Sequence, residues 1–310
     1  MRQDELISDP AALIENEIKR YVATSPNNLM PSHIGGVIWD EPVVRFADGD
    51  DAIFQEYKTI VGDFHVAPRE ALETHLAKVA RGYHHPQKVS VISWVLPATL
   101  ETRRSLRRET QVCSLRWNYT RWYGQETNFR LARHLVVMLE DMGFHAVAPE
   151  LESWFEVRRD VANGPASRWS QRHVAYAAGL GTFGLNDGFI TPKGIAVRIG
   201  SVVCDLAIPA SPRPYADHTA NCRFFRDGAC GRCIERCPAD AISEKGHDKA
   251  KCSDYMSNVM PRVLEELGRG AGYVGRYLGC GFCQTGTPCE AGIPPVKRSR
   301  RHPDTKAAVS

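Results

Sequence analysis

Cysteine is the residue type whose spacing carries the most chemistry in this chain. Of the ten cysteines in 310 residues, eight lie in the last third of the sequence. In chain order they are Cys222, Cys230, Cys233, Cys237, Cys252, Cys280, Cys283 and Cys289. The short gaps before Cys237, and the proline that follows it, are typical of cysteine runs that bind cubane iron–sulfur clusters. Eight thiolates are the number that two [4Fe–4S] clusters require.

The order of these cysteines predicts how they divide between two clusters. In a two-cluster ferredoxin the fourth cysteine of a run ligates the other cluster. We therefore expect one cluster on Cys222, Cys230, Cys233 and Cys289, and the other on Cys237, Cys252, Cys280 and Cys283. The first gap is seven residues and the last is five, both longer than the two and three residues of the bacterial pattern. Gly228 and Gly286 lie in these longer segments, where loops could absorb the extra length.

Two other uses of the cysteines are weaker alternatives. The pair Cys230 and Cys233 alone would suit structural zinc. Disulfides are disfavoured because nothing in the chain marks it as secreted. Cys113 and Cys204 stand outside both groups, and we expect them to be small buried side chains.

Composition and terminal sequence bound the class of protein. The net charge of +3 is too small to indicate a partner. The first twenty residues carry early acids and no apolar segment, so they resemble neither a signal peptide nor a membrane anchor. The longest apolar stretch, residues 89–100, is interrupted by serines and a proline and is too short to cross a bilayer. The sequence predicts a cytoplasmic protein without a membrane partner.

Periodicity and turn residues predict an α+β protein of two domains. A helix should begin at Asp9 and Pro10, a second should span residues 68–80, and a third should end at Gly143. Strands are expected at residues 88–94, 144–148, 195–199 and 201–208. We place the first domain at residues 1–212, with an N-terminal arm at 1–66, and the cysteine-rich domain at 213–295. Residues 296–310 form a basic tail, expected to be flexible, which could meet RNA phosphates or remain solvated.

A glycine-rich turn follows a predicted helix at residues 170–178. Gly179, Gly181 and Gly184 carry no Cβ, so their backbone could approach a planar ligand or a phosphate closely. Their spacing matches the G-x-G-x-x-G sequence pattern of dinucleotide-binding proteins. That pattern requires a strand before the glycines and a helix after them, whereas here a helix precedes them. The turn therefore does not predict nicotinamide binding.

The glycine turn and its neighbours resemble a known family. Residues 170–184 read SQRHVAYAAGLGTFG, and they are followed by ITPKG at 190–194 and RIGS at 198–201, all upstream of the cysteines. This combination resembles the epoxyqueuosine reductase and reductive dehalogenase superfamily over about residues 88–294. The resemblance implies a nitroreductase-like domain that holds cobalamin, followed by a bacterial two-cluster ferredoxin-like domain. It places Gly179, Leu180, Gly181, Gly184 and Arg198 at the cofactor.

The resemblance also implies a proton donor, and three residues are candidates. Asp160 is the carboxylate nearest to the family's acidic segment, although it reaches Gly164 and Pro165 by a longer path. Tyr123 and His173 could also donate protons. The surroundings of His65 fail the family pattern for a histidine ligand, so we expect no histidine on cobalt.

The chain departs from both well-known branches of the superfamily. Only about twenty residues follow Cys289, which leaves no room for the helical-repeat region of many epoxyqueuosine reductases, and the export signal of respiratory dehalogenases is missing. The aromatic and basic stretch at residues 116–123 could stack bases, cover a corrin face, or form a partly buried wall.

These observations favour one function and leave others open. The leading hypothesis is a cobalamin-dependent reductase in which reduced ferredoxin or flavodoxin loads the clusters, the clusters pass electrons to cobalamin, and a small or tRNA-borne substrate is reduced. The alternative is an electron-transfer or activating iron–sulfur protein that binds no cobalamin and donates electrons to a partner enzyme. A flavin in the nitroreductase-like domain is a third possibility.

Overall fold

The computed structural model describes residues 8–79, 85–161, 164–275 and 279–295. The basic tail predicted at residues 296–310 lies outside these ranges. The described chain mixes helices with a sheet, which confirms the mixed class expected from the sequence. The finer expectation, a nitroreductase-like domain followed by a ferredoxin-like domain, stays a prediction.

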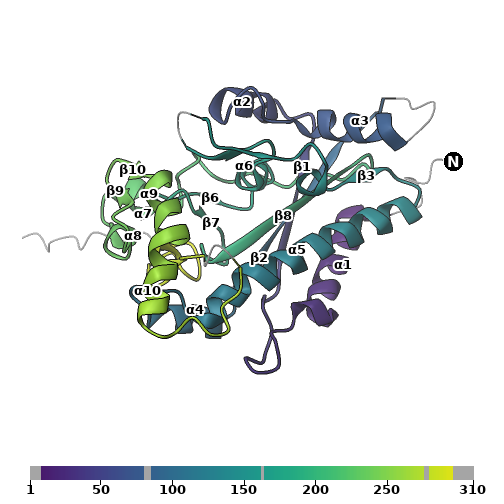
Figure 1. Ribbon diagram of the computed structural model, residues 1–310. Helices are drawn as coiled ribbons and strands as arrows, with labels where there is room; N and C mark the ends of the chain where they lie inside the picture. Colours follow the sequence, from purple (N-terminus) through teal and green to yellow (C-terminus); the bar gives the residue numbers. More distant parts are fainter. Residues whose placement is uncertain (1–7, 80–84, 162–163, 276–278, 296–310) are drawn as a thin grey trace, which may run out of the picture.

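A four-stranded antiparallel sheet forms the centre of the molecule (Figure 1). Its order is β1 (Val43–Asp48), β2 (Ser90–Pro97), β8 (Val197–Cys204) and β3 (Ala146–Val147). Every residue of β2 is buried, because the strand is central and both of its faces are covered. Ile92, Trp94 and Leu96 point into one core and Val91 into the other, as the two-residue repeat of a strand dictates.

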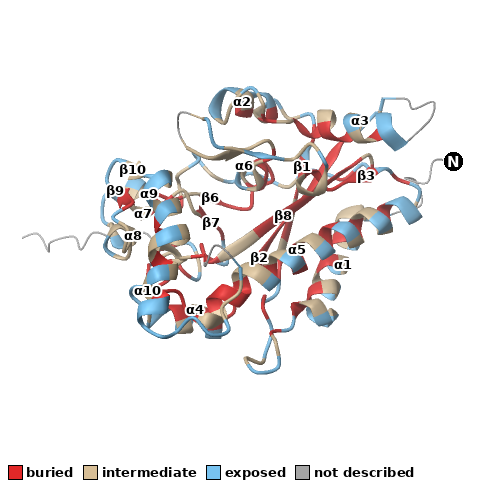
Figure 2. Cartoon of the chain, in the orientation of Figure 1, coloured by how far each residue is buried: buried red, intermediate tan, exposed pale blue. Residues whose placement is uncertain are grey.

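Helices cover both faces of this sheet (Figures 1 and 2). On one face α1 (Pro10–Thr24) and the long α5 (Leu115–Asp141) bury their apolar sides against the strands. On the other lie α2 (Ile53–Ile60), α3 (Pro68–Val79) and α6 (Gln171–Ala177). Helix α4 (Leu100–Arg107) follows β2 and leads toward the cysteine-rich end.

The start of α1 agrees with the prediction from sequence. The Asp9 carboxylate accepts a hydrogen bond from the Ala12 amide at 2.9 Å, and Pro10 occupies the first turn. Ile14, Ile18 and Val22, which share one face, are buried. The cap and the apolar stripe therefore fix where this helix begins and how it packs.

Two features of the sheet differ from the sequence expectations. The strands predicted at 195–199 and 201–208 are a single strand, β8, which runs through Gly200. A Cβ at Gly200 would lie 2.4 Å from the ring of Trp94, so glycine is needed for close packing in mid-strand. The segment predicted as an arm contributes strand β1, which pairs with β2 along its whole length.

The cysteine-rich segment lies at one end of the sheet (Figure 1). Its elements are α7 (Arg223–Asp227), α8 (Arg232–Glu235), the hairpin β9 (Ile242–Ser243) and β10 (Gly246–His247), α9 (Lys249–Asp254), a π-helical turn (Tyr255–Val259), α10 (Met260–Glu266) and a 3-10 turn (Phe282–Gln284). The Ile195 amide donates to the Cys289 carbonyl at 2.9 Å, and the Asn186 amide donates to the Cys283 carbonyl at 3.0 Å. One backbone bond and one side-chain bond thus tie this segment to the chain that precedes β8.

Two further hairpins and two single turns complete the fold. The hairpin β6 (Thr182–Phe183) and β7 (Phe189–Ile190) follows α6, and β4 (Val157–Arg158) pairs with β5 (Ala166–Ser167) before it. The turns are 3-10 helices at Pro26–Asn28 and Pro149–Leu151.

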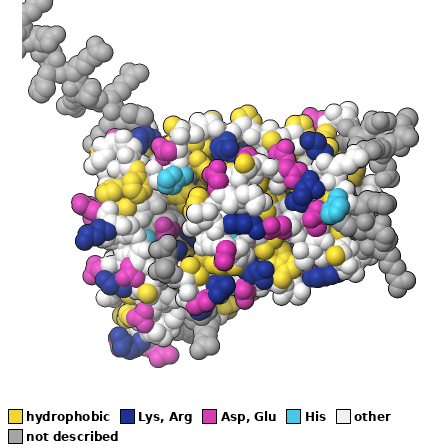
Figure 3. Space-filling model, turned by 90° about the horizontal axis from the view of Figure 1, so that it is seen from above, with side chains coloured by type: hydrophobic (Ala, Val, Ile, Leu, Met, Phe, Trp, Pro, Cys, Tyr) yellow, Lys and Arg dark blue, Asp and Glu magenta, His cyan; other side chains and the backbone are white. Residues whose placement is uncertain are grey.

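The surface carries charges of both signs. On the face shown in Figure 3, basic and acidic side chains are interspersed over the described residues. None of the helices in the described ranges combines the length and the apolar character needed to cross a membrane.

Candidate functional site

Four thiols that the sequence groups together surround one small cavity. Cys222, Cys230, Cys233 and Cys289 all line it, and we call them the Cys222 group. Apolar side chains, including Ile190 and Ile195, close the rest of its wall. Burial, together with repulsion from the other three thiols, raises the pKa of the Cys233 thiol to about 12. The structure therefore brings a four-sulfur donor set together in a dry environment.

The other four cysteines also lie within electrostatic reach of one another. Burial raises the pKa of Cys280 well above its usual value, and repulsion from Cys283, Cys252 and Cys237 acts in the same direction. We call these four the Cys237 group. Burial likewise raises the pKa of Cys283 to about 12, and Cys233 of the first group contributes to that shift. The two groups are thus close neighbours, linked through Cys233 and Cys283.

Several sulfurs receive hydrogen bonds from the surrounding chain. The Ala241 amide donates to Cys237 Sγ at 3.3 Å, and the Thr287 hydroxyl lies 3.4 Å from Cys289 Sγ. The Asn186 side chain bonds the Cys283 sulfur, and His247 bonds that of Cys252. Donors of this kind stabilise negative charge on thiolates and tune the potential of any cluster that they hold. Among the described residues, no three acidic, histidine or cysteine side chains converge in a way that would suit a single metal ion.

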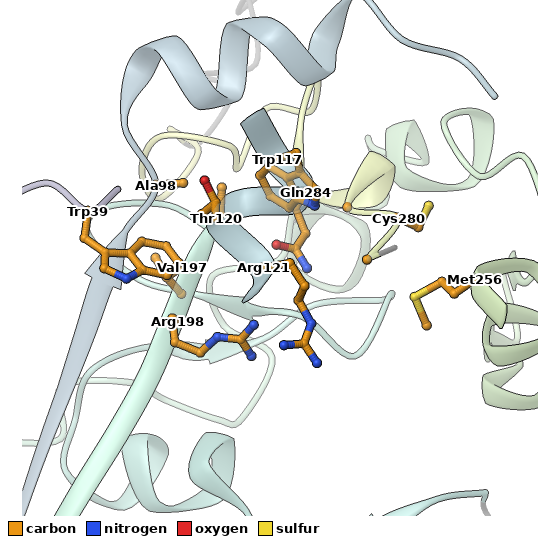
Figure 4. Close-up of a pocket in the computed structure, with 13 residues that line it drawn as sticks. Trp39, Ala98, Trp117, Thr120, Arg121, Val197, Arg198, Met256, Cys280 and Gln284 are labelled. Atoms are coloured by element: carbon orange, nitrogen blue, oxygen red, sulfur yellow. The ribbon is translucent and has the colours of Figure 1, made fainter. Parts of the chain in front are cut away.

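A cavity of about 190 Å³ opens between the sheet and the Cys237 group (Figure 4). Cys280, Gln284 and Met256 line it from the cysteine-rich segment. Its remaining walls come from the loop before β1, the end of β2, helix α5 and strand β8: Trp39, Ala98, Trp117, Thr120, Arg121, Ala196, Val197 and Arg198, with Gly279 and Gly281 beside Cys280. Cys280 of the Cys237 group therefore lines the same cavity as two tryptophans and two arginines of the sheet domain.

A second cavity of about 360 Å³ continues from the first. The two share Val197, Arg198 and Gln284 and so adjoin one another, and we call the pair the cleft. The second part is lined by β4, β5, the start of α6 and β7, including Phe155, Phe189 and Glu150. The cleft thus extends from Cys280 to Phe189 of β7 and Gln171 of α6.

Four charged side chains line the cleft: Arg121, Glu150, Arg172 and Arg198. Burial lowers the pKa of Arg198 to about 9, with a further contribution from the nearby Arg121, whereas Glu150 opposes the shift. Burial also lowers the pKa of Arg121. Glu150 accepts a hydrogen bond from the Gln171 amide at 3.0 Å, but burial outweighs this bond and both arginines, so its pKa is raised. Protonation of this carboxyl group is accordingly easier than in water.

The predicted glycines of the turn are positioned by backbone packing. Gly179 has φ +78°, and a Cβ there would lie 2.2 Å from the Pro212 carbonyl oxygen. A Cβ at Gly181 would lie 2.3 Å from the Ile190 carbonyl oxygen. Leu180 is buried in the apolar cluster behind the turn, and Gly184 lines the cavity of the Cys222 group. Of the predicted cofactor residues, Arg198 is the one that faces the cleft; contact of the others with a cofactor stays a prediction.

The predicted proton donors lie away from the lining of the cleft. Asp160 is ion-paired with Arg158 at 2.6 Å on the surface, and this pairing lowers its pKa. The Tyr123 side chain is exposed on α5 and stacks edge-on against Tyr119. His173 Nδ1 lies 2.7 Å from the Ser170 hydroxyl, and burial lowers its pKa to about 3, so its ring is neutral at pH 7. Their catalytic roles stay predictions.

Sequence reasoning found Arg198 but missed the other charged residues that meet in the cleft. Glu150 was not considered; it lies in the 3-10 turn Pro149–Leu151, shortly after the buried strand β3, and an acidic residue in such a connection is a recognisable signal. Arg121 was noted only as part of the aromatic and basic stretch 116–123. In the structure Trp117 and Arg121 of that stretch line the cleft, whereas Arg116 bonds the Gly35 carbonyl at 2.9 Å. Some residues of the stretch therefore line the cleft, whereas others make structural contacts elsewhere. Cys113 and Cys204 are buried, as expected.

Comparison with known proteins places the chain beside one family. No family model matches it. It is 30% identical over 151 residues to the epoxyqueuosine reductase of Bacillus cereus, a match that covers 48% of this chain and 36% of that protein. The epoxyqueuosine reductase of Synechocystis is 29% identical over 149 residues, covering 45% of this chain and 44% of the relative. The chain thus spans less than half the length of these curated relatives.

Solved structures of epoxyqueuosine reductases also align with this chain. The epoxyqueuosine reductase of Bacillus subtilis aligns with a TM-score of 0.45 and 18% identity, covering 91% of this chain and 66% of that one. An epoxyqueuosine reductase bound to a modified tRNA-Tyr stem loop aligns with a TM-score of 0.42 and 15% identity, covering 92% and 67%. The sequence matches confirm the resemblance to epoxyqueuosine reductases that the motifs indicated.

Proposed function

We propose that this chain is an iron–sulfur oxidoreductase, similar to epoxyqueuosine reductase, that delivers electrons through two [4Fe–4S] clusters to a cobalamin that reduces a small or tRNA-borne substrate. The observation that carries the proposal is the position of Cys280. This residue belongs to the Cys237 group and also lines the cleft in the sheet domain. A cluster bound by the Cys237 group would therefore donate its electron into the cleft, where a substrate and a second cofactor would bind.

The cysteine donor sets suit cubane clusters. Each group offers four soft sulfur ligands in apolar surroundings, with amide or hydroxyl donors directed at several sulfurs. Because their pKa values are raised when the thiols carry no metal, cluster assembly must release protons. Because Cys233 and Cys283 are neighbours, clusters bound by the two groups would be close enough to exchange single electrons.

The cleft residues suit a large cofactor that is rich in amide groups. Trp39 and Trp117 offer flat apolar walls, and Gln284 and Arg198 offer hydrogen-bond donors. Gln125 and Gln171 add amides in the second part of the cleft. When bound, cobalamin would supply a cobalt centre of low potential that can reduce the substrate.

Glu150 is the best-placed proton source for such a reduction. It is the acidic side chain among the residues that line the cleft, and burial favours its protonated form. Reduction of a substrate adds protons as well as electrons, and an acid with a raised pKa can hold one ready near neutral pH. Gln171 fixes the orientation of the carboxyl group by its hydrogen bond.

The opposite end of the cysteine-rich segment suits an electron donor. Cys230 of the Cys222 group lines an open groove on the surface. Arg107 and Arg232 also line this groove, and each is paired with a glutamate of the same groove, Glu290 and Glu235 respectively. A donor protein such as reduced ferredoxin or flavodoxin, with complementary charges, would be able to approach the cluster there. Electrons would then enter at Cys230, pass between Cys233 and Cys283, and leave at Cys280.

The proposal is tested by cofactor binding. Protein purified and reconstituted without oxygen is titrated with aquocobalamin, and the absorption spectrum is followed. We expect saturable spectral changes at about one cobalamin per chain, as a single cleft predicts. Failure to bind cobalamin while both clusters are present would favour the electron-transfer protein without cobalamin. A flavin spectrum in the purified protein would instead favour a flavin reductase.

A further inference from the structure

Two guanidinium groups face one another in the part of the cleft beside Cys280. Arg121 extends from α5 and Arg198 from β8, and Figure 4 shows their charged ends turned toward each other below Gln284. Each repels the other strongly enough to help lower the pKa of Arg198. Both side chains keep part of their surface exposed to the cavity. Two positive charges are thus held together at a site that a ligand can reach.

The protein supplies little negative charge to balance them. Glu150 is the carboxylate that acts on both arginines, and its raised pKa favours the neutral form. One of its oxygens is already engaged by Gln171. Among the described residues, neither arginine takes part in a salt bridge. Within the described ranges, the two guanidinium groups therefore face Glu150 alone as a possible counter-charge, and no salt bridge neutralises them.

One donor of the pair has no acceptor. Arg198 Nε is buried and forms no hydrogen bond. The contrast with Arg107 is direct, because the Arg107 fork donates two bonds, of 2.7 and 2.5 Å, to the Glu290 carboxylate. A buried charged group without a partner is costly, and such groups gather at functional sites. The missing acceptor of Arg198 is therefore best explained by a ligand.

We propose that Arg121 and Arg198 bind an anionic oxygen group, a carboxylate or a phosphate, of the substrate that is reduced in this cleft. This inference rests on the proposed function and adds the class of substrate to it. Two guanidinium forks that converge from different elements match the planar geometry of a carboxylate and the several oxygens of a phosphate. An anion held there would fix the substrate between Cys280 on one side and Glu150 on the other.

Equilibrium dialysis of the reconstituted full chain tests the site, with radiolabelled inorganic phosphate and acetate as probes. The variants are Arg121→Gln and Arg198→Gln, and the matched control is Arg130→Gln, which removes an exposed arginine from the same helix α5. We expect each cleft variant to bind the preferred anion at least about tenfold more weakly, because each loses a charge-assisted hydrogen bond. The control should bind as the wild type does.

The relative affinities of the two probes identify the chemistry of the substrate. Preference for acetate indicates a carboxylate substrate, and preference for phosphate indicates a phosphorylated one. The inference is overturned if wild type and both cleft variants bind the two anions equally. The double variant, in which no guanidinium remains in the pair, should lose saturable binding altogether.

A second arm separates the substrate from the cofactor, because cobalamin itself carries a phosphate. Affinities for cobalamin and for cobinamide, which lacks that phosphate, are compared in the same variants. If the variants weaken only cobalamin binding, and cobalamin blocks the anion probes, the arginines serve the cofactor and the inference fails. If the probes still bind to the cobalamin-loaded chain, the inference stands. Anion binding that persists in a chain unable to bind cobalamin would reject the proposed function and keep the anion site.

Discussion

Arg107 on α4 and Glu290, the residue after Cys289, form a bidentate ion pair in which Arg107 Nε lies 2.7 Å from Glu290 Oε2. The Gly286 amide donates to the same carboxylate at 2.7 Å. Gly286 lies in the long gap before Cys289 that departs from the bacterial cysteine pattern. Glu290 therefore anchors the extra loop and joins the end of the cysteine-rich segment to the sheet domain.

Removal of Arg107 should destabilise this junction. In Arg107→Ala the buried Glu290 carboxylate keeps only Arg103, at 3.6 Å, as an ionic partner. We expect a loss of about 1–3 kcal/mol in the free energy of unfolding, because a buried charged acceptor loses two bonds. Thermal unfolding followed by circular dichroism without oxygen measures it. Arg104→Ala, an exposed change on the same helix, should leave Tm unchanged; equal Tm values for both variants would contradict the account.

The division of the cysteines predicts selective loss of iron. Cys237→Ser should damage the cluster held with Cys252, Cys280 and Cys283 and leave about four irons per chain on the other group. The matched variant Cys230→Ser should lose the other cluster instead. Iron analysis and electron paramagnetic resonance of the reduced proteins distinguish the two. Identical residual signals in both variants would show that the thiols are divided differently.

The Gly194 turn should tolerate no side chain. Its φ of +93° disfavours other residues, and a Cβ would lie 2.1 Å from the Glu290 carbonyl oxygen. Backbone strain alone costs about 1–2 kcal/mol, and the contact with a main-chain atom adds to it. Gly194→Ala should therefore lower Tm clearly in thermal unfolding. Gly270→Ala, where nothing lies within 4 Å of the added Cβ, is the control; a smaller loss in Gly194→Ala than in Gly270→Ala would count against this packing.

Glu150 should make stability depend on pH in a defined direction. Its pKa is raised in the folded protein, so the folded state binds more protons than the unfolded state above pH 4.5. This contribution favours folding at low pH and is lost as pH rises through the folded pKa. Relative to Glu150→Gln, which cannot titrate, the wild type should lose stability as the pH rises above 4.5 and through the raised pKa of Glu150. Urea unfolding of both proteins over a series of pH values checks it, and a constant difference between the proteins would refute the shift.

Some features of this protein could be predicted from the sequence and others could not. The eight cysteines were recognisable as possible cluster ligands because most ligands of one cluster lie close together in the sequence. The fourth ligand is expected to come from the other run of cysteines. The start of α1 was equally clear from Asp9 and Pro10. Local rules were sufficient to group the cysteines and to place the start of the helix, whereas cluster binding itself stays a prediction.

The cleft depends on contacts that no local rule encodes. Arg121 and Arg198 are 77 positions apart in the numbering and meet because α5 packs along β8. Strand β8 was predicted as two strands because Gly200 resembles a break, whereas tertiary packing against Trp94 requires that glycine. Strand β1 was missed since Arg45 and Asp48 interrupt its apolar pattern, and pairing with β2 stabilises it nonetheless.

The most direct test of the central claim is the iron and cobalt content of the full chain after purification without oxygen and reconstitution with iron, sulfide and cobalamin. Two clusters next to a cobalamin cleft predict about eight irons and about one cobalt per chain. About four irons, or eight irons without any cobalt, would contradict the claim that two clusters supply a cobalamin in this cleft.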